Sequence, residues 1–157
     1  MTNIFRFVQV FALGTWVGSI LYFAIVVAQS VFAVLGINDQ AGAIIGHSLA
    51  GLHHLGLVAS ILFLVAAVLL ARSLRALLKP ASLLVILMLV MAGASQHIVI
   101  PRMEALRLQM GSVVNTPHSS PMRVEFDRLH GISVDLEMAT LLAGLVALFL
   151  TARKEQP

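Results

Sequence analysis

Long apolar stretches separated by short polar ones run through this chain from end to end. Four of them, at about residues 5–28, 44–71, 81–100 and 131–151, carry almost no charge. Each is long enough to cross the hydrocarbon layer of a bilayer, which needs about 20 helical residues. The pattern predicts an all-α integral membrane four-helix bundle, with residues 1–157 forming a single transmembrane domain.

The polar stretches between these segments predict where the chain turns. Gly36-Ile37-Asn38-Asp39 is a turn signal, and Pro80 suits the first turn of the third helix. Pro101 should end or kink that helix. Residues 102–121 begin with a helical pattern and continue with glycine, serine and proline. We therefore expect a long outer loop between the third and fourth helices.

The first span contains Gly14-Thr15-Trp16-Val17-Gly18, whose glycine spacing lets helices approach closely in lipid. We interpret the two glycines as a packing seam within the bundle. Trp16 lies near the middle of the span, away from the interfaces where tryptophan is enriched, so we expect it to be packed inside.

Composition agrees with a membrane protein, because 59% of the residues are hydrophobic and 11% are charged. Basic residues flank the segment ends that would share one side of the membrane: Arg6, Arg72, Arg75, Lys79, Arg153 and Lys154. The other side has fewer, interleaved with acidic residues, and this bias predicts an N-in, C-in topology in a bacterial inner membrane. The basic residues form no stripe, so the net charge of +3 does not indicate a nucleic-acid partner.

Several kinds of chemistry have no support in this sequence. The chain has no cysteine, which excludes thiolate metal sites and covalent c-type haem. It also lacks a nucleophile and base at a recognised spacing, a glycine loop for phosphate and a metalloprotease motif. Enzymatic activity therefore has little support.

The six histidines, at positions 47, 53, 54, 97, 118 and 130, all fall on the outer side of the membrane in this topology. Counted from the inner charges at about 1.5 Å per residue, His54, His97 and His130 lie within about 8 Å of one plane near the outer interface. Imidazoles on three helices at a common depth predict a site for haem b or a transition-metal ion, copper or zinc. Haem would make the protein an electron carrier or redox sensor, and a bare ion would indicate metal handling.

Helical spacing indicates which residues of the second span would join this site. His47, Gly51 and His54 share one stripe, and Gly51 would let a flat macrocycle approach the backbone. His53 points about 100° away from His54. Whether His53 or His54 faces the bundle interior stays open.

Three carboxylates are candidates to complete a metal site or to orient its imidazoles. Asp127 and Glu137 lie on the helical stripe of His130, and Glu104 follows His97 by seven residues.

A second hypothesis needs no cofactor. His130, Glu137, Asp135 and Arg102 would form a buried polar network that fixes the helix arrangement of a structural or partner membrane protein. Besides the lipid bilayer, its partner would be a second copy of the chain or another membrane protein. Translocation ranks last, because residues 61–70 and 141–150 in the inner halves of spans two and four contain no polar relay.

Ile100-Pro101-Arg102-Met103, followed by Arg123-x-x-Phe126-x-x-x-His130-Gly131-Ile132-Ser133, resembles the transmembrane-protein-205-like family of small four-helix membrane proteins, and Trp16-x-Gly18 fits it too. The resemblance implies the fold but no catalytic residues, since the function of that family is unknown. It implies a counterpart for one histidine of span two, His53 or His54. Position 97 need not be histidine, which favours His54 with His130. In size and layout alone, the chain is similar to the copper-resistance D and protoporphyrinogen-oxidase J groups, which are associated with copper and haem.

Overall fold

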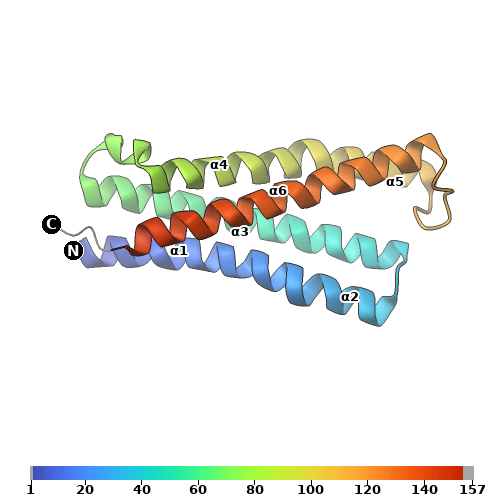
Figure 1. Cartoon of the computed structure of the whole chain (residues 1–157), viewed down its shortest axis with the longest axis horizontal. Coiled ribbons are helices and arrows are strands. Elements are labelled where there is room, and N and C mark those ends of the chain that lie inside the picture. The colour runs from blue at the N-terminus through green and yellow to red at the C-terminus, as the bar shows by residue number, and fades with distance from the viewer. Residues whose placement is uncertain (1, 154–157) are drawn as a thin grey trace.

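The structure is a computed structural model that describes residues 2–153 as an almost wholly helical chain (Figure 1). The first span comprises α1 (Thr2–Tyr22), the π-helix η1 (Phe23–Val27) and α2 (Ala28–Leu35). The second is α3 (Asp39–Ala71), followed by the 3-10 helix η2 (Leu74–Leu78). The third comprises α4 (Pro80–Ala94), the π-helix η3 (Ser95–Val99) and α5 (Ile100–Met110), and the fourth is α6 (Pro121–Ala152). The all-α prediction is confirmed.

Four helical stretches of 31 to 33 residues are each long and apolar enough to cross a membrane: Asn3–Leu35, Asp39–Ala71, Pro80–Met110 and Pro121–Ala152. At 1.5 Å per residue they measure about 46–50 Å, whereas a hydrocarbon core is about 30 Å thick. The chain is therefore an integral membrane protein whose helices extend beyond the apolar layer.

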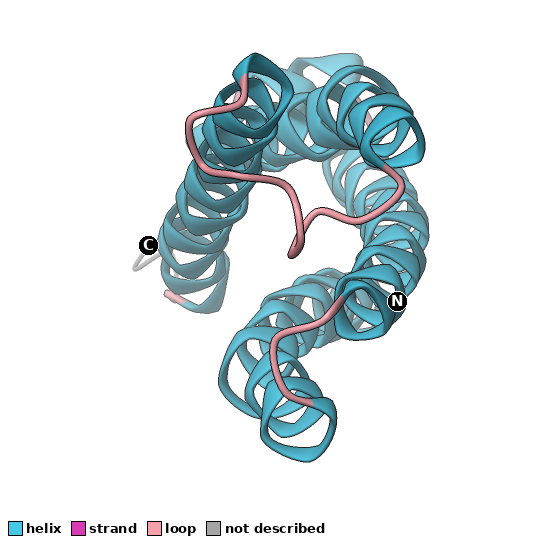
Figure 2. Cartoon of the chain, turned by 90° about the vertical axis from the view of Figure 1, so that its right-hand side faces the viewer, coloured by secondary structure: helices cyan, strands magenta, loops and turns pink. Residues whose placement is uncertain are grey.

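Consecutive spans run antiparallel. The first and last described residues therefore lie at the same end of the bundle as η2, and this end is here called the terminal end (Figure 1). The turn at residues 36–38 and the loop at residues 111–120 lie at the opposite end, which is here called the loop end. In the terminal half, α1 and α4 each pack against both α3 and α6, which closes a ring of four helices. Toward the loop end, α2 packs on α3 while α5 packs on α6, and Figures 1 and 2 both show α2 apart from α5.

Among the described residues, the basic side chains predicted to share one side of the membrane fall at the terminal end: Arg6, Arg72, Arg75, Lys79 and Arg153. Lys154 lies outside the described residues. Arg6 links the first and last helices there, since its guanidinium donates to the carbonyl oxygens of Thr151 at 3.4 Å and Arg153 at 2.5 Å.

The helices extend farther than the apolar pattern predicts, and the loop before α6 is limited to residues 111–120 instead of 102–121. The expectation that Pro101 ends the third span is corrected, because the chain stays helical through it as far as Met110. The alternative, a kink, stays a prediction. In a regular α-helix the ring of Pro101 would clash with the carbonyl four residues earlier. The π-helix Ser95–Val99 directly precedes it, and there the N–H of Ile100 donates to the carbonyl of Ser95, five residues back.

The predicted turn at residues 36–39 is confirmed and lies between α2 and α3. Gly36 has φ +71°, a backbone conformation that glycine adopts without a steric penalty. Asn38 caps α3, because its side-chain oxygen accepts from the N–H of Ala41 at 2.8 Å.

The core of the terminal half is dry and tightly filled. Leu13, Trp16, Phe63, Val85 and Met88 are at most 1% exposed. The expected interior position of Trp16 is confirmed. Its indole lies directly over Gly56, where an added Cβ would come within 2.4 Å of the ring.

The packing seam predicted at Gly14 and Gly18 is wrong within one copy of the chain. An added Cβ at either position would meet no heavy atom within 4 Å. The close approach of α1 to α3 instead places a large residue, Trp16, against a glycine of the other helix, Gly56.

Candidate functional site

A cluster of three polar side chains from three spans lies inside the bundle. His53 of α3 is 6% exposed. Its Nδ1 atom is 2.9 Å from Oε1 of Gln96, in η3, and its Nε2 atom is 2.5 Å from Oε1 of Glu137, in α6. The side chain of Glu137 is 17% exposed, so this carboxylate lies at the edge of the buried region. The three residues are here called the polar triad.

Lipid around the bundle explains why His53 faces inward. Large apolar residues of α3, including Leu57, Ile61 and Val65, are exposed on the outer surface of the helix. The inward stripe instead carries small or polar residues at helical spacing, His53, Gly56 and Ser60. Small and polar side chains let helices approach and hydrogen-bond to one another in lipid, so this stripe faces the neighbouring spans together with buried large residues such as Phe63.

The fourth span follows the same rule. Its buried stripe includes Ser133, Thr140, Gly144 and Ala147, and Glu137 falls on the same face between the first two. Gly144 allows α6 to approach α1 and α4, since a Cβ there would come within 2.6 Å of Val17 and 2.9 Å of Met88.

Gln96 lies in the π-helix η3, where the wider turn changes the direction in which successive side chains point. Single π-turns in α-helices are rare and are often found at functional sites. The neighbouring Ser95 is fully buried. Its hydroxyl oxygen has no hydrogen-bond partner among the described residues.

The hydrogen-bond roles in the triad follow from the chemistry of Gln96. An amide oxygen only accepts, so Nδ1 of His53 carries a hydrogen and donates it to Oε1 of Gln96. The 2.5 Å contact between Nε2 and Oε1 of Glu137 then requires one more proton between these two atoms. The pair is either imidazolium with carboxylate or imidazole with carboxylic acid, and in both forms it is electrically neutral.

All three members lie at a similar depth from the terminal end. At 1.5 Å per residue, His53 is about 27 Å along its helix from Ala71, Gln96 about 24 Å from Pro80 and Glu137 about 23 Å from Ala152. If an apolar layer of about 30 Å begins at the terminal end, the triad lies inside it, near its far boundary.

The structure distributes the predicted haem or metal ligands differently from the expectation. Gly51, His54, His97 and His130 are all exposed, and no hydrogen bond or ion pair joins them among the described residues. His53, not His54, faces the interior, which answers the question that the sequence left open. His54 lines a groove of about 430 Å³ between α1 and α3, where nearly all of the lining is apolar.

Two of the predicted carboxylates are engaged at the loop end. Glu104 forms an ion pair with Arg107 at 2.6 Å, and Asp127 accepts from Arg123 at 2.9 Å. In the part of the chain that the structure describes, no group of three or more histidine, cysteine, aspartate or glutamate side chains is placed to hold a metal ion. Within the described residues the structure does not bring these candidate ligands into one group, and the haem or metal site stays a prediction.

The predicted polar network is right in kind but differs in its members. Of the four residues expected in it, only Glu137 belongs to the triad. His130, Asp135 and Arg102 are exposed.

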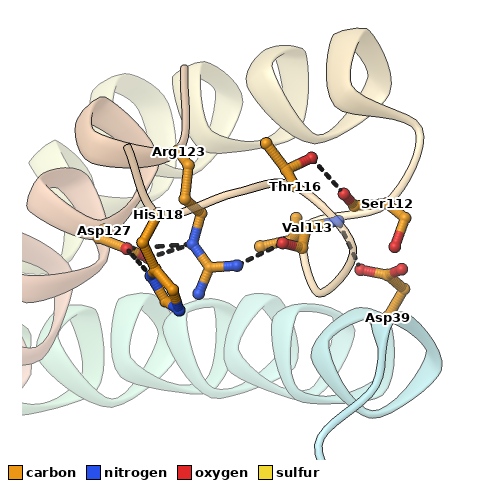
Figure 3. A network of polar contacts seen from close by, with 7 residues as sticks. All are labelled: Asp39, Ser112, Val113, Thr116, His118, Arg123 and Asp127. Atoms are coloured by element: carbon orange, nitrogen blue, oxygen red, sulfur yellow. Dashed lines mark hydrogen bonds and ion pairs between the residues drawn. The ribbon is translucent and has the colours of Figure 1, made fainter. Parts of the chain in front are cut away.

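Figure 3 shows a second polar cluster, which anchors the loop of residues 111–120 at the loop end. Asp39, in the first turn of α3, accepts from the N–H of Val113 at 2.9 Å. Arg123 of α6 donates to the carbonyl of Val113 as well as to Asp127. His118 lies 3.6 Å from Asp127 and has a largely exposed side chain. These contacts tie the loop to two spans.

Residues 11–112 match the model of a family described as Domain of unknown function (DUF4149). The chain belongs to this family. The matched region contains His53 and Gln96, while Glu137 lies beyond its end in the fourth span. Among curated proteins and among solved structures, none matches this DUF4149 protein significantly.

The sequence prediction missed Gln96 and left open whether His53 or His54 faces the interior. A signal for His53 was present, since Gly56 and Ser60 follow it at helical spacing and form with it a small and polar part of the buried face of α3. No comparable signal marks Gln96, whose direction depends on the π-turn before Pro101.

Proposed function

We propose that this DUF4149 member is a cofactor-free structural or partner membrane protein in which the polar triad fixes the arrangement of three spans. The proposal rests on the contacts of His53, in the second span, with Gln96 in the third span and Glu137 in the fourth. A helix that rotated or shifted along its axis would lose these contacts and leave polar groups unpaired in an apolar interior.

The energetics favour a role in specifying the arrangement over a role in adding stability. A buried ion pair contributes little net stability, because removing both groups from water costs about as much as their attraction returns. Losing one partner is costly, since the other is then left unpaired in a low-dielectric region. The triad therefore penalises alternative packings of α3, η3 and α6 more than it stabilises the observed one.

Haem or metal binding stays a prediction with less support. Such a site requires the imidazoles of His54 and His130 to bind the same group, whereas both side chains are exposed. An absorption spectrum and an elemental analysis of protein purified from its own host test it directly, and a Soret band or stoichiometric copper or zinc would favour it.

A double-mutant cycle on His53→Ala and Glu137→Ala tests the structural role. The measured quantity is the free energy of unfolding in detergent micelles for the parent, both single variants and the double variant. Hydrogen-bonded pairs in membrane proteins couple by about 0.6 kcal/mol on average and by up to about 1.7 kcal/mol. A contact of 2.5 Å that shares a proton belongs at the upper end, so we expect a coupling of about 1.5 kcal/mol.

The chain offers a matched control cycle. His54 is the exposed neighbour of His53, and Asp135 is an exposed carboxylate two residues before Glu137. His54→Ala and Asp135→Ala should be additive within about 0.5 kcal/mol, because the two side chains do not meet. Equal coupling energies in the two cycles would show that the triad has no special role.

Three finer assignments belong to the same proposal. The motif around Pro101 and His130 supports an assignment to the transmembrane-protein-205-like proteins. The basic residues at the terminal end favour a bacterial inner membrane with both termini in the cytoplasm. A second copy or another membrane protein is the expected partner. Labelling of single cysteines at the two ends, in a chain that has none, tests the topology.

A further inference from the structure

We infer that the His53–Glu137 pair is a proton-binding site that exchanges its proton with the loop end only. The inference rests on the triad that carries the proposed function, and it adds a ligand, the proton, and a direction of access. It is argued from the hydrogen-bond roles within the triad and from the packing on either side of it.

One proton of the triad is exchangeable without disturbing the rest. The hydrogen on Nδ1 of His53 is held by Gln96, and the second proton lies between Nε2 and Glu137. When this second proton leaves for water, the pair becomes neutral imidazole and carboxylate, and its net charge falls from zero to −1. When a proton returns, the neutral pair is restored.

Access from the terminal end is blocked by the core. Leu13 and Trp16 of α1, Phe63 of α3 and Met88 of α4 fill the interior there and are at most 1% exposed. The hydroxyls of Ser60 and Thr140 are buried, but each donates to a carbonyl of its own helix. The hydroxyl of Ser95 has no partner among the described residues, but toward the terminal end the apolar side chains of Ala92 and Met88 follow it on the buried face of α4.

The loop end is packed much less closely. Neither α2 nor α5 contains a buried residue, and both views show α2 apart from α5 (Figures 1 and 2). Glu137 is itself partly exposed. If the apolar layer begins at the terminal end, the triad lies only a few Å from its loop-end boundary by the helix rise, so the distance to water is short on this side.

Among the described residues, no hydrogen bond or ion pair joins the His53–Glu137 pair to another charged group. The other titratable groups close in sequence on the packed elements are exposed: His47 and His54 on α3, His97 on η3, and His130 and Asp135 on α6. In η1 and α2 there is no titratable residue, and Tyr22 at the end of α1 is exposed. Arg102 of α5 is exposed as well.

Loss of the proton has a structural consequence. Nε2 of His53 and Oε1 of Glu137 would then face each other as two acceptors, an arrangement that is unfavourable at 2.5 Å. The imidazole must turn away or α3 and α6 must separate locally. Proton release is thereby coupled to the contact between two spans.

The test uses the full chain in liposomes with different pH values inside and outside. A Ser119→Cys change in the exposed loop adds the single thiol of the protein, and an impermeant maleimide then reports what fraction of molecules has the loop end outside. Dicyclohexylcarbodiimide, an apolar reagent, modifies protonated carboxyls, and fragmentation mass spectrometry measures the modification at Glu137. The Glu137→Gln variant confirms the assignment of the signal.

We expect modification of Glu137 to follow the pH on the side of residue 119. Modification should fall as the pH rises on that side and stay constant when the pH at the terminal end changes. Modification that follows the terminal-end pH, that follows both sides equally or that ignores pH would overturn the inference. If the stability cycle still shows coupling in that case, the proposed structural role survives; if the coupling is absent as well, both fail.

Discussion

Replacing Gly56 with alanine should destabilise the bundle, because this glycine makes room for the only tryptophan of the chain. A Cβ at position 56 would lie 2.4 Å from Cε2, 2.5 Å from Nε1 and 2.6 Å from Cζ2 of Trp16. All three distances are far inside van der Waals contact, and the indole is 1% exposed, so it has no free space to move into. Overpacking of this kind costs about 1–3 kcal/mol.

Gly51→Ala, on the same helix, is the matched control. A Cβ there meets nothing within 4 Å, so the change should add only the helix preference of alanine, about 0.5–1 kcal/mol of stabilisation. The two variants should therefore differ by about 1.5–4 kcal/mol. A haem packed on Gly51 would reverse the expectation for the control, because the added methyl would displace it.

Trp16 provides the assay as well as the contact. Its fluorescence, followed during denaturation in mixed micelles, reports the loss of the α1–α3 interface without any added label. The reasoning is refuted if Gly56→Ala unfolds at the same denaturant level as Gly51→Ala, since the indole would then not rest on α3 as described.

Three further expectations follow from single contacts. Ser95→Ala should leave thermal stability unchanged or raise it, because the buried hydroxyl has no partner among the described residues. Ser60→Ala is the control and should lower thermal stability, because it removes a 2.7 Å hydrogen bond to the carbonyl of Gly56. A large loss of stability in Ser95→Ala would contradict this expectation. Asp39→Ala should speed amide hydrogen exchange at Val113 by roughly two- to tenfold, through loss of a bond of about 0.5–1.5 kcal/mol. Arg6→Ala should increase exchange in the last turn of α6, and unchanged exchange would show that Arg6 does not hold that helix end.

The architecture could be predicted from the sequence because it depends on averages over many residues. Each apolar segment is longer than a bilayer requires, and no single substitution would change that conclusion. The turn at Gly36 was predictable for a different reason, namely that one backbone conformation there requires glycine. The ends of the helices were not, because charged residues beyond the apolar layer are equally compatible with helix and loop. The full length of α5 and the first turns of α6 therefore went unpredicted.

The polar triad lies near the depth predicted for the ligand site but consists mainly of other residues than the predicted ligands. His54 and His97 were expected inside, yet each is exposed beside a member of the triad, His53 and Gln96. Depth changes by only 1.5 Å between neighbours on a helix, whereas direction changes by about 100°. An error of one residue therefore changes the predicted depth very little, but it changes which side chain faces the interior.

Lipid supplies the missing information about direction for two of the three residues. In a membrane bundle small and polar side chains are enriched where helices face one another. Applied to the sequences of α3 and α6, this rule selects His53 with Gly56 and Ser60, and Glu137 with Thr140, although large residues such as Phe63 are buried on the same face of α3. Gln96 escapes the rule, because it lies in a π-turn, whose wider winding changes the direction of the helix face at that point. A second π-turn, at Phe23–Val27, lies in a span that has no proline, so a proline pattern alone would not locate such a turn in the sequence.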